Sequence, residues 1–151
     1  MKKPVKELED FGKKLVADIE KGRNPTIEFT LRSLSNIVFD TKTKTLMLGD
    51  KQQQRAFFNV GHAKKFLQTL EVGRVSRKLL DAGKHASLRD VFYMAKRTLP
   101  DSSINIVDDQ DESDNAIEDL ELITDCSREQ LNINANKMGS VAGNVTIEDS
   151  G

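Results

Sequence analysis

The fold predicted from this sequence rests on residues 62–97, HAKKFLQTLEVGRVSRKLLDAGKHASLRDVFYMAKR. Apolar residues recur at helical spacing over residues 63–70 and again over residues 75–82, with a break near Gly73. Gly83 ends the second of these helices, and a third follows after a short turn. Two helices joined by a short glycine-containing turn indicate a helix-turn-helix, and a neighbouring strand pair would make it a winged helix.

The third predicted helix has two distinct faces. It begins at Ser87, and Asp90 three residues later completes the pattern of a capping box. At 100° per residue, the apolar side chains gather on one face: Leu88, Val91, Phe92, Ala95 and Leu99. The opposite face carries Arg89, Tyr93, Lys96 and Arg97. The only tyrosine of the chain is therefore expected to point towards solvent among cations.

The sequence before this stretch predicts one helix and a few strands. Residues 5–22 have the apolar spacing of a helix that ends at Gly22. Residues 26–50 are rich in Thr, Ile, Val and Phe and predict two or three short strands, with a turn near Asp40 to Lys44. Residues 49–62 are predicted to be loop with a short extended piece.

The sequence after this stretch is acidic. Residues 101–115 predict an exposed connection, and a helix is expected over residues 115–124 with Ser113 or Asp114 as its cap. The segment VTI, residues 145–147, predicts a final strand. The acidic extension is interpreted as a solvated connector whose helix packs on the winged helix, or alternatively as a guard over the basic face.

The predicted fold class is α+β and mostly helical: a CAP-like helix-turn-helix with a small antiparallel β wing and an acidic C-terminal extension. Its predicted parts are an N-terminal helix (residues 1–25), a winged-helix domain (26–100) and an acidic connector with a short helix (101–151).

Charge divides the chain sharply. Residues 1–100 carry 21 basic against 11 acidic residues, a net charge of +10, whereas residues 101–151 carry 2 against 13, a net charge of −11. This asymmetry favours a polyanion-binding face followed by a segment of different purpose. No disulfide within the chain is possible with Cys126 alone, no apolar run has membrane-spanning length, and we expect no signal peptide. We expect a cytoplasmic, nucleoid-associated protein with no membrane partner.

Tyr93 is a candidate nucleophile. A phenol of ordinary pKa, about 10, is mostly protonated near neutral pH and needs a base or cations nearby to react. Arg89 lies one helical turn before Tyr93, where its guanidinium could hold the phosphate that the phenolate attacks. The same spacing is common on exposed helices, so a tyrosine that merely contacts phosphate stays open.

Other chemistry is less well supported by the sequence. His62 and His85 have no partner at metal-ligand spacing, and the acidic run at Asp108 to Asp111 follows no buried strand that would fix it. No residue of this chain is therefore expected to hold a metal. Nucleotide-binding glycine motifs and Ser-His-Asp or Cys-His sets are absent.

A family resemblance rests on several quoted stretches. RSLSNIVFD (residues 32–40), LMLGDKQQQRAFFNVGHAKKFLQTL (46–70) and SLRDVFYMAKR (87–97) resemble the A subunit of archaeal DNA topoisomerase VI, a type IIB topoisomerase. SDNAIEDLELIT, REQLNI and GSVAGNVTI extend the similarity over nearly the whole chain. The first three of these stretches are more distantly similar to the eukaryotic meiotic double-strand-break transesterase.

The resemblance implies a role for named residues. It makes Tyr93 the catalytic tyrosine and Arg89 the motif arginine, and we expect Lys96, Arg97, Lys84 and Arg77 to contact double-stranded DNA. In such an enzyme the phenol attacks a phosphodiester, which leaves a 5′-phosphotyrosyl link and a free 3′-hydroxyl. Two A subunits cut opposite strands, and a B subunit binds and hydrolyses ATP in an A2B2 assembly.

The resemblance also implies a limit. Mg²⁺ is held in this family by a Toprim domain, and the sequence stops about where that domain should begin. We therefore expect part of a longer A subunit that binds DNA and does not cleave it alone. The alternative is a winged-helix DNA-binding protein or regulator without chemistry.

Overall fold

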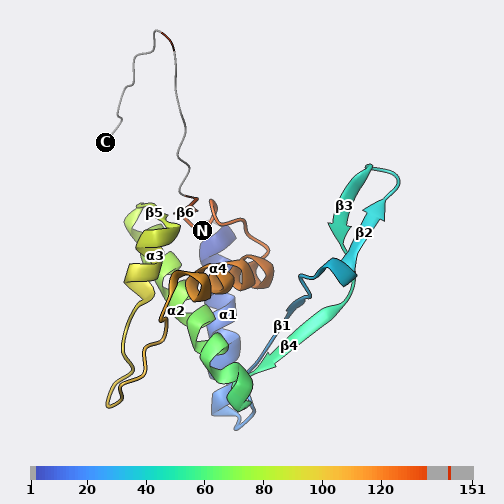
Figure 1. Cartoon of the computed structure of the whole chain (residues 1–151). Helices are drawn as coiled ribbons and strands as arrows, with labels where there is room; N and C mark the ends of the chain where they lie inside the picture. The colour runs from blue at the N-terminus through green and yellow to red at the C-terminus, as the bar shows by residue number, and fades with distance from the viewer. Residues whose placement is uncertain (1–2, 136–142, 144–151) are drawn as a thin grey trace.

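The computed structural model describes residues 3–135 and residue 143 (Figure 1). Its elements in chain order are α1 (Lys3–Glu20), β1 (Thr26–Thr30), η1 (Leu34–Asn36), β2 (Ile37–Asp40), β3 (Thr45–Leu48), β4 (Gln52–Ala56), α2 (Val60–Ala82), β5 (Ala86–Ser87), α3 (Leu88–Ala95), α4 (Gln110–Thr124) and β6 (Ile133–Asn134). The fold is α+β and winged-helix-like, as predicted. The strand expected at residues 145–147 lies outside the described residues.

Helix α2 runs without interruption, so the predicted break near Gly73 is wrong. A Cβ built on Gly73 would lie 3.6 Å from the Leu120 side chain and 3.7 Å from that of Leu8. Glycine therefore sits where α1 and α4 both approach α2. Burial of Val72 and Val75 in that contact outweighs the roughly 1 kcal/mol that glycine costs inside a helix.

The turn of the helix-turn-helix lies between Gly83 and Ser87, as predicted from the sequence. Gly83 ends α2 in the left-handed region, at φ 63°, and its N–H donates to the carbonyls of Leu79 and Leu80. Helix α3 starts with the predicted capping box, in which Ser87 and Asp90 satisfy each other's backbone N–H groups. Both signals are local, which explains why the sequence could supply them.

Strands before α2 form two separate pairs. β1 pairs antiparallel with β4, from Thr26 opposite Ala56 to Thr30 opposite Gln52, so a strand occupies residues predicted to be mostly loop. β2 and β3 form a hairpin with its turn at residues 41–44, as predicted. The hairpin projects away from the helices (Figure 1).

The wing position after α3 is taken by a loop that doubles back on itself. Thr98 and Asn105 form an isolated antiparallel bridge. The Leu99 N–H donates to Ile104 and the Ile106 N–H to Arg97, at 2.9 and 2.8 Å. We call residues 97–106 the wing loop; it extends from the end of α3 (Figure 1).

Helix α4 begins earlier than predicted and belongs to the core. Asp109 caps it, whereas the hydroxyl of the expected cap Ser113 is buried and donates to the Gln110 carbonyl. Ile117 and Leu120 are fully buried, and α4 lies across α1 and α2 (Figure 1). The predicted division at residues 25 and 100 stays a prediction, but α1 and α4 share one apolar cluster with α2 and α3.

Candidate nucleic-acid interface

Helix α3 presents Tyr93 to solvent, as predicted from its periodicity. Val91 and Ala95 are fully buried on the inner face, with Leu88 and Phe92 packed against the same cluster. Tyr93 is 57% exposed, and its ring contacts that of Phe92 with centroids 5.0 Å apart. The core thus fixes the helix while the phenol stays accessible.

Arg89 stands beside Tyr93. Its guanidinium carbon lies 5.9 Å from the centre of the Tyr93 ring, one helical turn away. The pKa of Arg89 is raised above its usual value, mainly by hydrogen bonding with the Tyr93 side chain. A permanent cation therefore faces the phenol where negative charge would develop during attack on a phosphate.

The two cations after α3 do not share one helical face, because the helix ends at Ala95. Lys96 is the C-cap, and its Nζ lies 5.4 Å from the centre of the Phe92 ring. Arg97 lies beyond the helix and its guanidinium turns towards α2, with Nη1 3.6 Å from the carboxylate of Glu71. The face predicted for Arg97 is wrong, although its side chain remains 57% exposed.

The remaining predicted DNA contacts lie in different surroundings. Lys84 is exposed in the turn between α2 and α3, and its carbonyl accepts a hydrogen bond from Asn132. Arg77 bonds Glu9 of α1 at 2.8 Å and Asp81 at 2.9 Å. Hydrogen bonding to Glu9, and then to Asp81, raises the pKa of Arg77. Arg77 is therefore neutralised by protein carboxylates, and DNA binding by it stays a prediction.

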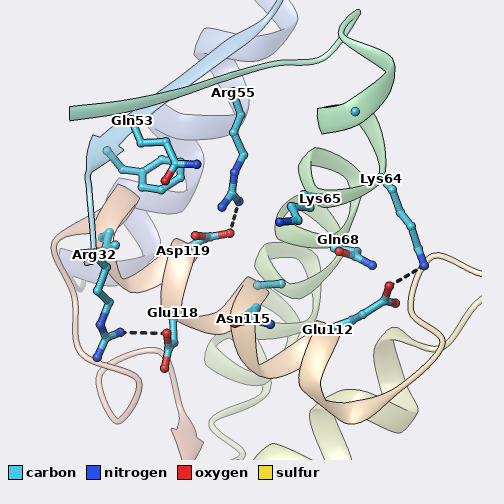
Figure 2. Close-up of a pocket in the computed structure, with 14 residues that line it drawn as sticks. Arg32, Gln53, Arg55, Lys64, Lys65, Gln68, Glu112, Asn115, Glu118 and Asp119 are labelled. Atoms are coloured by element: carbon cyan, nitrogen blue, oxygen red, sulfur yellow. Dashed lines mark hydrogen bonds and ion pairs between the residues drawn. The ribbon is translucent and has the colours of Figure 1, made fainter. Parts of the chain in front are cut away.

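Acidic residues after Pro100 pair with basic residues of the first hundred. Figure 2 shows three such pairs. Arg32 with Glu118 and Arg55 with Asp119 join the strand region to α4, and Lys64 with Glu112 joins α2 to α4. Lys64 at the start of α2 bonds Asp108 and Glu112 at 2.7 and 2.6 Å, which raises the pKa of Lys64. Part of the charge asymmetry is thus cancelled within the fold.

These pairs line a cavity of about 510 Å³ between β1, β4, α2 and α4 (Figure 2). Arg55 and Asp119 are 10% and 14% exposed, and the Arg55 guanidinium also stacks on Phe29 at 4.8 Å. Most charged side chains of the cavity wall are paired with one another. These ion pairs join α4 to the strand region and to α2. The sequence alone did not identify it, because its walls come from four separate segments.

The described residues do not fit a magnesium site. Within residues 3–135 and 143, no group of three or more His, Cys, Asp and Glu side chains could hold a metal ion. Asp109 caps α4, and Asp108 is bound to Lys64 and Asn105. Among the same residues, no helix is both long and apolar enough to cross a membrane.

Comparison with known proteins points to one family. Residues 64–133 match the model of the type IIB DNA topoisomerase family. The chain is 41% identical over 147 residues to the A subunit of type 2 DNA topoisomerase 6 from Pyrococcus abyssi, an alignment of 97% of this chain and 38% of that protein. The corresponding protein of Hyperthermus butylicus is 34% identical over 157 residues, with 99% of this chain and 41% of that protein covered. The chain thus spans about two fifths of the length of these relatives.

Proposed function

We propose that the protein supplies the DNA-binding and strand-cleaving part of a topoisomerase VI A subunit, because residues 64–133 match the model of the type IIB DNA topoisomerase family. The observation that carries this proposal is the exposed phenol of Tyr93 beside the guanidinium of Arg89. Helix α3 is the second helix of a helix-turn-helix, the element that such folds present to DNA.

The proposed reaction is a transesterification. The Tyr93 hydroxyl loses its proton and its oxygen bonds to a DNA phosphorus, while the bond from that phosphorus to the 3′-oxygen breaks. The leaving 3′-oxygen takes up a proton and becomes a free hydroxyl, and the 5′-phosphate stays on the tyrosine. Arg89 stabilises the negative charge that spreads over the phosphate oxygens. Religation is the same exchange in reverse.

ATP binding and Mg²⁺ binding are proposed to take place outside the described residues. The described residues offer no metal site, so we propose that a B subunit binds ATP and that Mg²⁺ is held elsewhere in the A subunit. Two A subunits would cut opposite strands of one duplex in an A2B2 assembly that works on DNA in the cytoplasm. Lys96, Arg97 and Lys84 would contact the phosphate backbone, which fixes orientation without reading sequence.

The test replaces Tyr93 with phenylalanine in the full-length A subunit that contains this sequence, assembled with its B subunit. Tyr93→Phe is expected to abolish the covalent protein–DNA adduct formed with ATP and Mg²⁺. Its affinity for duplex DNA should stay within about twofold, because backbone cations supply most of the binding. An adduct that persists without the hydroxyl would rule out Tyr93 as nucleophile and favour a DNA-binding role without chemistry.

A further inference from the structure

A buried carboxylate lies behind the predicted DNA face. Glu71, in the middle of α2, has a side chain only 8% exposed. It accepts hydrogen bonds from Arg74 at 2.8 Å through Nε and 2.5 Å through Nη2. Its Oε1 also lies 3.6 Å from Nη1 of Arg97, which arrives from beyond the end of α3. One carboxylate therefore joins two guanidinium groups on different elements.

A neighbouring side chain of α2 holds the same loop. Gln68, three residues before Glu71 and 4% exposed, donates through Nε2 to the Ile106 carbonyl at 2.9 Å. Ile106 in turn donates its N–H to the Arg97 carbonyl at 2.8 Å. Arg97 and Ile106, the first and last residues of the wing loop, are thus each bound by a side chain of α2. Lys64, four residues before Gln68 on α2, binds Asp108 just beyond the wing loop.

Stability alone does not account for Glu71. Burying a carboxylate costs free energy, and a buried ion pair can often be replaced by apolar residues with little or no loss. Both of its partners are partly exposed, Arg74 at 33% and Arg97 at 57% of the side chain, so neither cation needs Glu71 to be solvated. What Glu71 does supply is a carboxylate oxygen 3.6 Å from the Arg97 guanidinium, an ion pair between α2 and the segment after α3.

Resting on the function proposed above, we propose that Glu71 is a positioning residue for DNA cleavage. Its carboxylate binds one edge of the Arg97 guanidinium and leaves the exposed edge for a phosphate oxygen near the end of the Tyr93 helix. A guanidinium has five N–H donors in a rigid fork, so it can bridge a carboxylate and a phosphate at once. Glu71 acts through Arg97 and touches no DNA itself.

The test uses Glu71→Gln in the full-length A subunit with its B subunit. We expect the cleavage rate at saturating DNA to fall about tenfold, since misplacement of one phosphate-binding group is costly. The affinity for duplex DNA should stay equal or rise, because a negative charge has been removed near the phosphates. In an Arg97→Ala background, Glu71→Gln should have no further effect on the rate.

Matched variants make each outcome decisive. Arg74→Gln breaks the bond within α2 alone and should leave cleavage within about twofold of the wild type. Arg97→Lys keeps the charge but loses the fork, and should lower cleavage as Glu71→Gln does. Wild-type cleavage by Glu71→Gln overturns the proposal, and so does wild-type cleavage by Arg97→Lys. So does a parallel loss of affinity, cleavage and thermal stability in Glu71→Gln, or a rate loss that persists without Arg97.

Tyr93→Phe, measured alongside, separates the two proposals. If Tyr93→Phe still forms an adduct, the proposed function fails. If Tyr93→Phe forms none while Glu71→Gln cleaves at the wild-type rate, the function stands and the role of Glu71 fails.

Discussion

At the scale of single residues, the pair Tyr93 and Arg89 concentrates the chemistry proposed for this chain. Arg89 is exposed, and its guanidinium carbon lies 5.9 Å from the centre of the phenol ring. Neither side chain is needed by the apolar core, which holds α3 through Val91 and Ala95. Changes at Tyr93 and Arg89 should therefore affect cleavage far more than folding.

Replacing Arg89 by glutamine should slow cleavage about 10²- to 10³-fold at saturating DNA, the size of effect seen when one preorganised donor to a developing charge is removed. The slope of log affinity against log salt concentration should fall by about 0.9, as for one lost phosphate contact. Rates of adduct formation and salt titrations of DNA binding measure the two effects.

A charge-matched control for Arg89→Gln is Arg23→Gln. Arg23 is exposed after α1 and pairs with Asp18 at 3.6 Å. The Arg23→Gln variant should cleave DNA at the wild-type rate. Equal losses in both variants would mean that net charge, and not the position of Arg89, determines the rate.

At the scale of elements, α3 depends on its amino-terminal cap. The Ser87 hydroxyl donates to the Asp90 carboxylate at 2.7 Å, and the Ser87 N–H donates to it at 3.1 Å. These bonds, the hydroxyl first, lower the pKa of Asp90 below its ordinary value of 3.8. The ionised carboxylate is therefore the form that the folded helix favours.

This shift predicts how stability depends on pH. A carboxylate whose pKa is lower in the folded state contributes stability above its unfolded pKa and loses it as pH falls through the folded pKa. The Tm of the wild type should therefore exceed that of Asp90→Asn at pH 7, and the difference should shrink below about pH 4. Thermal unfolding followed by circular dichroism at pH 3 to 7 measures it.

The control for Asp90→Asn makes the same charge change on another helix. Asp10 is exposed on α1, and Asp10→Asn should give a Tm difference from wild type that does not shrink in this way. A constant difference between wild type and Asp90→Asn down to pH 3 would contradict the role of the ionised cap.

At the scale of the whole molecule, the two charged halves form one structure. Ion pairs join residues 101–125 to the basic part of the chain: Lys3 with Asp125, Arg32 with Glu118, Arg55 with Asp119, and Lys64 with Asp108 and Glu112. Apolar packing does the same, since Ile117 and Leu120 lie in the cluster formed by α1, α2 and α3. The helix of the acidic segment thus packs on the winged helix as expected, but it is part of the core and not of a solvated connector.

Leucine-to-alanine substitutions test this arrangement. Leu120→Ala removes a fully buried side chain and should lower the free energy of unfolding by about 3 kcal/mol. Leu46→Ala makes the same change on the projecting hairpin, where the side chain is 71% exposed, and should cost less than about 0.5 kcal/mol. Urea unfolding measures both, and equal values would show that α4 does not share the core.

Signals that depend on neighbouring residues could be predicted from the sequence. Gly83 and Ser87 end and begin helices through their own backbone and side-chain bonds, and the spacing of Val91 and Ala95 identifies the buried face of α3. The exposure of Tyr93 beside Arg89 follows from that same spacing. Each of these features spans at most one or two helical turns, so tertiary packing had little left to alter.

Contacts between segments that are distant in the chain could not be predicted from the sequence. Gly73 does not break α2, because packing against α1 and α4 outweighs the intrinsic preference of glycine. Residues 52–56 form a strand because β1 lies beside them. Arg97 lies beyond α3 and pairs with Glu71. The sequence around Glu71 shows only a local Glu–Arg spacing and does not predict this pair. Periodicity and capping depend on neighbours in the chain and so follow from its sequence, whereas burial and charge pairing depend on residues brought together from far along it.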